Sequence, residues 1–190
     1  MKYPIDRKER IILGGLKQTI HIWGTKPENP VVLFLHGGPG VPNRHGMAVN
    51  HMDLTDDFTI VAWDQRGTGG SYFGCDPASL TLDQLISDCA ELLRYLCKTL
   101  GKEKIFLLGA SWGTELGTFV CQRHPELVAG YIGYGQVVNG IENENVSYAY
   151  VLEKAKEAGN TEDIAELEKI GPPVDGQYKP VFEGLMAQRK

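Results

Sequence analysis

The segment Gly109-Ala110-Ser111-Trp112-Gly113 contains the residue types that nucleophilic acyl transfer needs, in the spacing G-x-S-x-G. It lies between a predicted strand and a predicted helix, and this motif requires that context. Glycine at both ends lets the strand and the helix close together, because a Cβ atom there would clash. We therefore predict that Ser111 lies on a sharp turn as a catalytic nucleophile; the alternative is a chance match in a chain of 23 glycines.

Two backbone groups are expected to stabilise the negative oxygen that forms during acyl transfer. The helix after Ser111 begins with unpaired N–H groups, and the Trp112 N–H is the natural first donor. The segment H-G-G-P-G at positions 36–40 directly follows another predicted strand, where small residues let the backbone approach a bound carbonyl. We choose Gly38 as the second donor of this oxyanion hole.

Other residues near these groups are assigned structural roles. His36 precedes Ser111, whereas the base that serves this kind of turn follows the nucleophile in the chain, so we expect a structural histidine. Asp64 and Arg66 follow a buried strand and are expected to tie loops over the sheet edge by hydrogen bonds and an ion pair. The structural residues near the site are therefore His36, Gly37, Pro39, Gly40, Asp64, Arg66, Gly109 and Gly113.

Three segments in this order, H-G-G-P-G, D-Q-R-G-T-G and G-A-S-W-G, resemble the proline iminopeptidase group of α/β-hydrolases. The resemblance covers about Leu16–Gly135 and continues more weakly over Glu142–Arg189, which looks like the family's helical cap after the sixth strand. It implies a serine hydrolase that releases N-terminal residues, often proline, from peptides through an acyl-enzyme on Ser111. It also implies a triad of Ser111 with a later Asp and a later His, and oxyanion donors at Gly38 and Trp112.

Two features depart from the pattern of that family. The family often has Arg where this chain has Gly70. No motif places the acidic cap residues with which the family binds a substrate amine, although Glu142 and Glu144 are carboxylates in that region.

No residue of the chain fits the acid or the base of a triad. Of the five histidines, only His124 follows Ser111, and it lies at the far end of the next helix, roughly 18–20 Å away. Asp163 and Asp175 lie in the cap-like segment rather than after a buried strand. We therefore expect a truncated chain that carries the nucleophile and oxyanion hole but has little or no activity alone, since nothing accepts the serine proton.

The predicted elements alternate between strands and helices, which indicates the α/β-hydrolase fold: a mostly parallel sheet with flanking helices. An antiparallel hairpin around a Gly14-Gly15 turn comes first, and continuous apolar runs follow it as buried strands. The predicted strands are Ile11–Leu13, Thr19–Trp23, Val31–Leu35, Phe58–Trp63, Ile105–Leu108 and Leu127–Ile132.

Helices are predicted between the strands and after them. Over Thr81–Leu100 the chain shows an apolar stripe and a capping box of Thr81 with Gln84. The other predicted helices are Trp112–Arg123, Glu142–Ala158 and Thr161–Ile170. We expect residues 1–138 to form the hydrolase core through the sixth strand and residues 139–190 to begin a helical cap.

Composition limits which binding partners, cofactors and cellular location we expect. The chain has 190 residues and a formal net charge of −5, which argues against nucleic acid and anionic membranes as partners. The four cysteines form no C-x-x-C pair, no phosphate loop occurs, and we expect neither a metal nor a cofactor. A charged N-terminus without an apolar core and the absence of a long apolar run predict a cytoplasmic protein. The last strand would be an exposed apolar edge that favours self-association.

Three functions stay open. The first is an aminopeptidase of the proline iminopeptidase type that acts on small peptides. The second is an esterase or amidase on the same scaffold, and the third is a non-catalytic binding module. Haloalkane dehalogenase and epoxide hydrolase activities are disfavoured, because they would need Asp where Ser111 stands.

Overall fold

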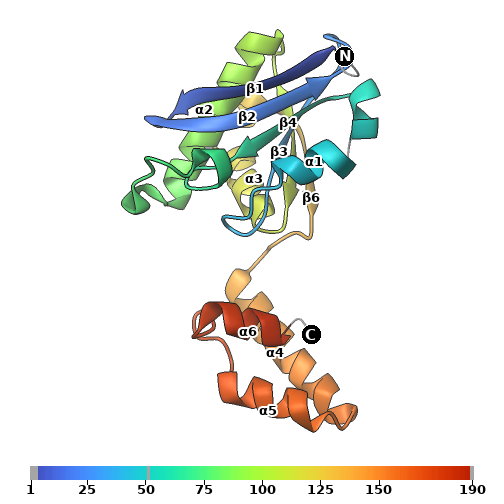
Figure 1. The fold of residues 1–190 in the computed structure, drawn as a ribbon, viewed down its shortest axis with the longest axis vertical. Helices are drawn as coiled ribbons and strands as arrows, with labels where there is room; N and C mark the ends of the chain where they lie inside the picture. The colour runs from blue at the N-terminus through green and yellow to red at the C-terminus, as the bar shows by residue number, and fades with distance from the viewer. Residues whose placement is uncertain (1–3, 51, 189–190) are drawn as a thin grey trace. The chain divides into compact units, whose positions relative to one another are not determined.

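The computed structural model describes residues 4–50 and 52–188. The chain divides into two compact units, Met1–Gln136 and Val137–Lys190. The first is a sheet flanked by helices, and the second consists of helices (Figure 1). Within the described residues, no helix is both long and apolar enough to cross a bilayer.

Six strands form one sheet in the described part of the first unit, in the order β1-β2-β4-β3-β5-β6. The β1–β2 and β2–β4 pairs are antiparallel, and the other pairs are parallel, so the carboxyl ends of β3, β4 and β5 meet at one edge. The strands are β1 (Ile5–Leu13), β2 (Leu16–Gly24), β3 (Val31–Leu35), β4 (Thr59–Asp64), β5 (Ile105–Ala110) and β6 (Val128–Tyr134). This arrangement confirms the predicted α/β-hydrolase sheet and its N-terminal hairpin.

The hairpin is longer than the sequence predicted. β1 begins at Ile5 because nine residue pairs join it to β2. The additional stretch carries the charges Asp6, Arg7, Lys8, Glu9 and Arg10, which hide the apolar alternation by which a strand is recognised.

The helices of the first unit cover the two faces of this sheet unequally. One face packs on α2 and α3, and the other packs on the short α1 through Met47, with Trp23, Phe34 and Ile60 beneath it (Figure 1). The sequence analysis did not predict α1. The helices are α1 (Arg44–Asn50), α2 (Leu82–Leu100) and α3 (Trp112–Arg123), with short 3-10 turns at Met52–Asp56, Gly69–Ser71, Pro77–Ser79 and Pro125–Leu127.

The ends of α2 confirm one half of the predicted capping box and contradict the other. The Thr81 hydroxyl accepts from the Gln84 N–H at 3.2 Å, and Gly101 ends the helix in a left-handed conformation. The Gln84 side chain, however, donates to Asp88 Oδ1 at 2.8 Å, and the Thr81 N–H donates to the Ser79 carbonyl. Because the Thr81 N–H already has the Ser79 carbonyl as its acceptor and the Gln84 side chain turns toward Asp88, the reciprocal bond predicted for the box does not form.

The strand β6 lies at the edge of the sheet and is not buried on both faces as its apolar run suggested. It pairs only with β5 in the described sheet, and its side chains Ile132 and Tyr134 are 62% and 76% exposed. Its edge therefore matches the open, apolar edge that the sequence predicted.

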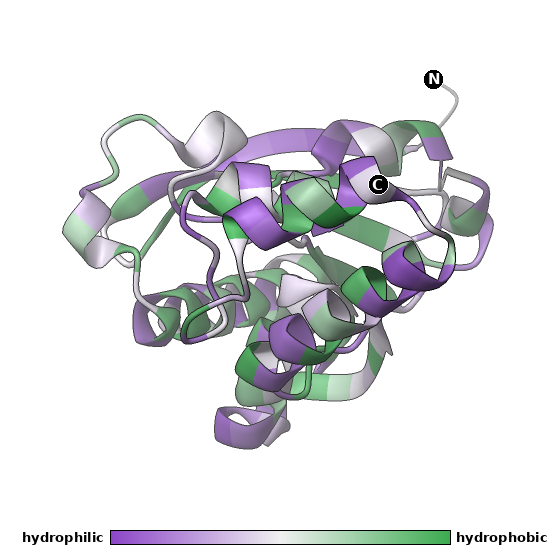
Figure 2. Ribbon diagram, turned by 90° about the horizontal axis from the view of Figure 1, so that it is seen from below, coloured by the Kyte–Doolittle hydropathy of each residue, from purple (hydrophilic) through white to green (hydrophobic). Residues whose placement is uncertain are grey.

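The second unit contains α4 (Gly140–Glu157), α5 (Thr161–Ile170) and α6 (Val181–Gln188), of which α6 was not predicted. Its small core gathers around Tyr148, whose hydroxyl donates to the Leu167 carbonyl at 3.0 Å. In Figure 2 the helical ribbons change between hydrophilic and hydrophobic colours along their turns, as expected for helices that bury one face.

Candidate active site

Ser111 lies in a strained turn between β5 and α3. Its φ of 51° and ψ of −123° fall in a region that non-glycine residues rarely adopt, at a cost of about 1–3 kcal/mol. Three hydrogen bonds hold this conformation: the Ser111 N–H donates to the Tyr134 carbonyl at 2.9 Å, and the Thr114 N–H and hydroxyl donate to the Ser111 carbonyl at 2.8 and 2.6 Å. Both polar backbone groups of Ser111 are therefore fixed.

The turn closes only because glycine stands on both sides of it. A Cβ atom on Gly113 would overlap the carbonyl oxygen of Leu35, and one on Gly109 would lie 2.6 Å from the Gly113 carbonyl oxygen. These contacts give the physical reason for the two glycines of the G-x-S-x-G segment.

The Ser111 hydroxyl is exposed at the carboxyl end of β5. Among residues 4–50 and 52–188, no side chain or backbone group is hydrogen-bonded to its Oγ. The Trp112 N–H belongs to the first turn of α3, where no carbonyl of the helix can accept it. A serine hydroxyl and a backbone N–H donor thus lie side by side in the chain, and no described residue is hydrogen-bonded to the hydroxyl.

The loop after β3 packs directly against Ser111. A Cβ atom built on Gly37 would lie 3.1 Å from the Ser111 Cβ and 3.6 Å from its Oγ. Gly38 follows with a φ of 120°, and its bond to Pro39 is cis. The structure therefore places Gly37 against the serine, while Gly40 lies farther along the same loop with a φ of 90°. The assignment of Gly38 as an oxyanion donor stays a prediction.

His36 is buried and fully engaged in hydrogen bonds. Its Nδ1 lies 3.0 Å from the Gly37 carbonyl oxygen, and its Nε2 accepts from the Gln65 N–H at 3.3 Å. Burial lowers the pKa of His36 below its ordinary value of 6.5, against the opposing influence of the Gly37 carbonyl and the Asp64 carboxylate. The ring is therefore a neutral structural element, with its Nδ1 as donor and its Nε2 as acceptor.

Asp64 and Arg66 make the predicted ties, but each with its own partner. Asp64 Oδ2 accepts from the Gly70 N–H at 2.9 Å and from Arg44 Nε at 3.2 Å. Arg66 forms two bonds with the carboxylate of Asp88 on α2, at 2.8 and 3.0 Å, and this pairing raises the pKa of Arg66.

Gly70, where the resembled family often has Arg, lies in close contact with the hairpin. A Cβ atom there would approach Thr19 Oγ1 to 2.5 Å. The local packing of this chain therefore suits glycine at that position.

Sequence reasoning missed several residues that build the surroundings of the site. Arg44 begins the unpredicted α1, and Asp88 is a buried charge on the core side of α2. Asp88 could have been noticed, because it lies among the apolar residues of the helical stripe. Gln65 acts through a contact with His36, 29 positions away, and Thr114 acts through bonds that form only once the turn at Ser111 has closed. The sequence carries no signal for either contact.

The histidines that lie outside the H-G-G-P-G loop do not serve Ser111 in the described structure. His124 ends α3 beside Glu126 at 3.5 Å, and His21 pairs with Asp6 at 2.6 Å. His45 is exposed, and His51 lies outside the described residues. In the part of the chain that the structure describes, no cluster of three His, Cys, Asp or Glu side chains could hold a metal ion.

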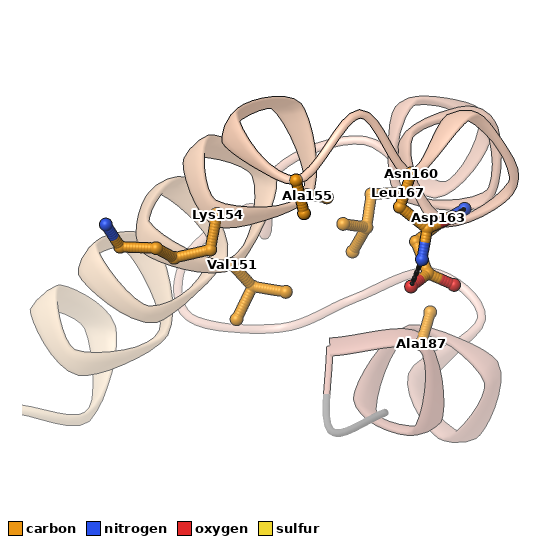
Figure 3. A pocket seen from close by; sticks show the side chains of 8 residues that line it. Val151, Lys154, Ala155, Asn160, Asp163, Leu167 and Ala187 are labelled. Carbon is orange, nitrogen blue, oxygen red and sulfur yellow. Dashed lines mark hydrogen bonds between the residues drawn. The ribbon is translucent and has the colours of Figure 1, made fainter.

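A hollow lies within the helical unit, between α4, α5 and α6, with a volume of about 230 Å³. Figure 3 shows its apolar wall at Val151, Ala155 and Leu167, and the hydrogen bond of Asn160 to Asp163 at its rim. The residues that line it include no hydroxyl, thiol or imidazole, and their polar groups are the Lys154 amine, the Asn160 amide and the Asp163 carboxylate.

Comparison with known proteins agrees with this geometry. Residues 30–160 match the family model of the alpha/beta hydrolase fold. The chain belongs to this hydrolase family. Over 153 residues it is 37% identical to the probable aminopeptidase YbaC of Bacillus subtilis (strain 168), covering 80% of this chain and 48% of that protein. It is 32% identical to a proline iminopeptidase of Lactobacillus acidophilus, covering 62% of this chain and 40% of that protein.

Solved structures extend the likeness of this hydrolase. A proline iminopeptidase-related protein from Thermus thermophilus superposes with a TM-score of 0.61 at 28% identity, covering 79% of this chain and 50% of that one. An epoxide hydrolase from Vigna radiata superposes with a TM-score of 0.55 at 29% identity, covering 67% of this chain and 37% of that one. The hydrolase described here spans about half the length of the curated relatives it matches, or less.

Proposed function

We propose that this hydrolase chain carries the nucleophile and the oxyanion hole of a serine aminopeptidase of the proline iminopeptidase type. In this proposal Ser111 attacks the carbonyl of the N-terminal residue of a small peptide. The N–H groups of Trp112 and Gly38 hold the oxygen of the tetrahedral intermediate, which then collapses to an acyl-enzyme and releases the shortened peptide.

One observation carries the proposal: an exposed, unpaired serine hydroxyl on a strained turn, with the loop of Gly37 against it. Non-glycine residues with such backbone angles concentrate at active sites, because the fold must compensate for their strain. The names of the aminopeptidase relatives favour peptides over other acyl substrates.

We further propose that polypeptide outside this chain supplies the acid and the base. Among the described residues, no imidazole or carboxylate is hydrogen-bonded to Ser111, and without an acceptor its proton stays in place. Helices α4 to α6 would begin the cap in this view. The 190-residue chain alone should then turn over almost no proline p-nitroanilide, and robust turnover that Ser111→Ala abolishes would contradict this.

Acylation of Ser111 tests the nucleophile itself. The purified chain is incubated with p-nitrophenyl acetate or a fluorophosphonate, with and without imidazole as an external base, and the modified residue is identified by mass spectrometry. We expect slow modification of Ser111 and a clear acceleration by imidazole, because an oxyanion hole alone retains part of the catalysis. Absence of modification under both conditions, or equal modification of Ser111→Ala, would refute the assignment.

Two alternatives give different results in the same assays. An esterase or amidase would also be acylated at Ser111, but a protein completed to the length of the relatives would prefer simple esters or amides over peptides. A non-catalytic binding module would not be acylated at all. An epoxide hydrolase is disfavoured by the serine at position 111.

Self-association through the edge of β6 is also proposed. Val128–Tyr134 contains no charged residue, and its outer backbone groups have no neighbouring strand in the described sheet. Light scattering at high protein concentration should show dimers, and Ile132→Lys should return the chain to monomers.

A further inference from the structure

The loop after β3 is hydrogen-bonded to one buried residue of the loop after β4, Gln65. Its backbone N–H donates to His36 Nε2 at 3.3 Å, and its side-chain Nε2 donates to the His36 carbonyl at 3.2 Å. Gln65 is only 2% exposed, so neither bond competes with water. Gln65 is therefore hydrogen-bonded to both the ring and the backbone of His36, and we call this pair of bonds the clamp.

Further hydrogen bonds fix both Gln65 and His36. Thr68 folds back on Gln65, with its N–H and its hydroxyl donating to the Gln65 carbonyl at 3.0 and 2.8 Å. The His36 ring in turn donates from Nδ1 to the Gly37 carbonyl. Gln65, His36 and Gly37 thus form a continuous chain of buried hydrogen bonds that ends at the residue packed against Ser111.

The loop has few other means of staying in place. Gly37, Gly38 and Gly40 have no side chain to pack, and glycine has more backbone freedom than any other residue. Across the loop, the hydrogen bond found among the described residues joins the Val41 N–H to the Gly37 carbonyl at a long 3.3 Å. Besides the packing of Gly37 against Ala110 and Ser111, the contact at His36 is therefore the main polar restraint on the loop.

We infer that Gln65 is a positioning residue, which holds the Gly37–Gly38 segment against Ser111 by clamping His36. The clamp is a property of the fold. Its effect on acylation rests on the proposed function of Ser111, since an oxyanion donor displaced by even about 1 Å loses much of its effect.

The chain offers a matched control, because it contains a second buried glutamine in the same unit. Gln18 is completely buried, donates to Asp88 Oδ2 at 2.6 Å and accepts from Trp63 Nε1 at 2.9 Å. It takes no part in the contacts of His36. Gln65→Met and Gln18→Met each replace a buried amide by an apolar side chain of similar length. Only the first removes a bond of the clamp, the one from the Gln65 side chain to the His36 carbonyl, while the backbone bond to His36 Nε2 is kept.

Two readouts separate the clamp from general stability. Amide hydrogen exchange of Val41, followed by NMR, reports on the loop, and that of Leu107 in β5 reports on the whole sheet. We expect Gln65→Met to accelerate exchange at Val41 by roughly tenfold or more relative to Leu107. It should also slow imidazole-supported acylation of Ser111 by roughly tenfold. Gln18→Met should change neither the exchange of Val41 relative to Leu107 nor the rate of Ser111 acylation. This should hold even if it lowers the free energy of unfolding more than Gln65→Met does.

Clear results would overturn the inference. It fails if Gln65→Met leaves the relative exchange of Val41 unchanged, or if Gln18→Met slows acylation as much as Gln65→Met does. Gln65→Leu provides a second variant that also removes the side-chain donor, and it should behave like Gln65→Met. If the wild-type serine is never acylated, the proposed function fails, while the exchange of Val41 still decides whether the clamp exists.

Discussion

Two loops at the same edge of the sheet, after β4 and after β5, differ in how their polar residues are bonded. After β4, the guanidinium of Arg66 is buried and bonded to Asp88, to the Leu13 and Gly14 carbonyls and to the Ser79 hydroxyl. After β5, the hydroxyl of Ser111 is exposed, has no partner among the described residues and lies on a strained backbone. The Arg66 guanidinium thus spends its hydrogen bonds on holding the fold together, whereas the Ser111 hydroxyl makes none with the described residues.

The contrast indicates how a polar residue near a predicted site can be assigned. Asp88 also accepts from the amides of Gln18 and Gln84, so this buried carboxylate has no capacity left for a substrate. Such a network stabilises one arrangement of the hairpin, α2 and the loop after β4. Ser111 lowers stability instead of adding to it, as expected of a group kept ready for chemistry.

The largest effect should follow from opening the network. Asp88→Ala leaves the buried Arg66 charge without its carboxylate and should lower the free energy of unfolding by about 3–5 kcal/mol. Urea denaturation followed by circular dichroism measures this loss. The control is the double variant Arg66→Met/Asp88→Leu, which removes both charges and should recover much of the stability. A loss below about 1 kcal/mol for Asp88→Ala would show that the network is not the structural element described above.

Sequence alone was enough for the buried parallel strand β3, for two helices and for the turn at Ser111, because their signals are local. The apolar run Val31–Leu35 became β3 without change, and the glycines around Ser111 mark a turn that no other residue fits. Trp112–Arg123 and Thr161–Ile170 were predicted with their observed bounds, since a turn or cap at the start and a Pro or Gly beyond the end limit each of them.

What the sequence did not reveal depends on contacts between distant segments. Gln65 and His36 are 29 positions apart, and Gln18 and Asp88 are 70 apart, so no spacing rule connects them. Helix α1 is only seven residues long, and only Met47 is buried among them, which leaves no amphipathic period to detect. Neither a local pattern nor a contact between described residues identifies an acid or a base for the proposed triad, so these two residues stay a proposal.

A pH titration of stability should reveal an intermediate effect at His36. Burial lowers its pKa in the folded state, so the unfolded chain takes up a proton more readily and gains stability relative to the fold as the pH falls below about 6.5. The free energy of unfolding should therefore decrease between pH 6.5 and the lowered folded pKa, by at most about 1.4 kcal/mol per pH unit. His36→Gln should lose this part of the slope, whereas His45→Gln, at an exposed position, should retain it. An unchanged slope in His36→Gln would mean that the ring is not held neutral.

The smallest effect, and the one that tests the contrast most directly, concerns the strain at Ser111 itself. Ser111→Ala removes the hydroxyl but keeps a Cβ atom on a residue with positive φ, whereas Ser111→Gly removes both. The difference in unfolding free energy between these two variants isolates the backbone strain, apart from the greater freedom of glycine in the unfolded chain. We expect Ser111→Gly to be more stable than Ser111→Ala by about 1 kcal/mol, because relief of strain outweighs that entropy. Neither variant should be acylated at position 111. If Ser111→Ala were instead the more stable of the two, the turn would store no strain, and its unusual backbone could no longer count in favour of a catalytic serine.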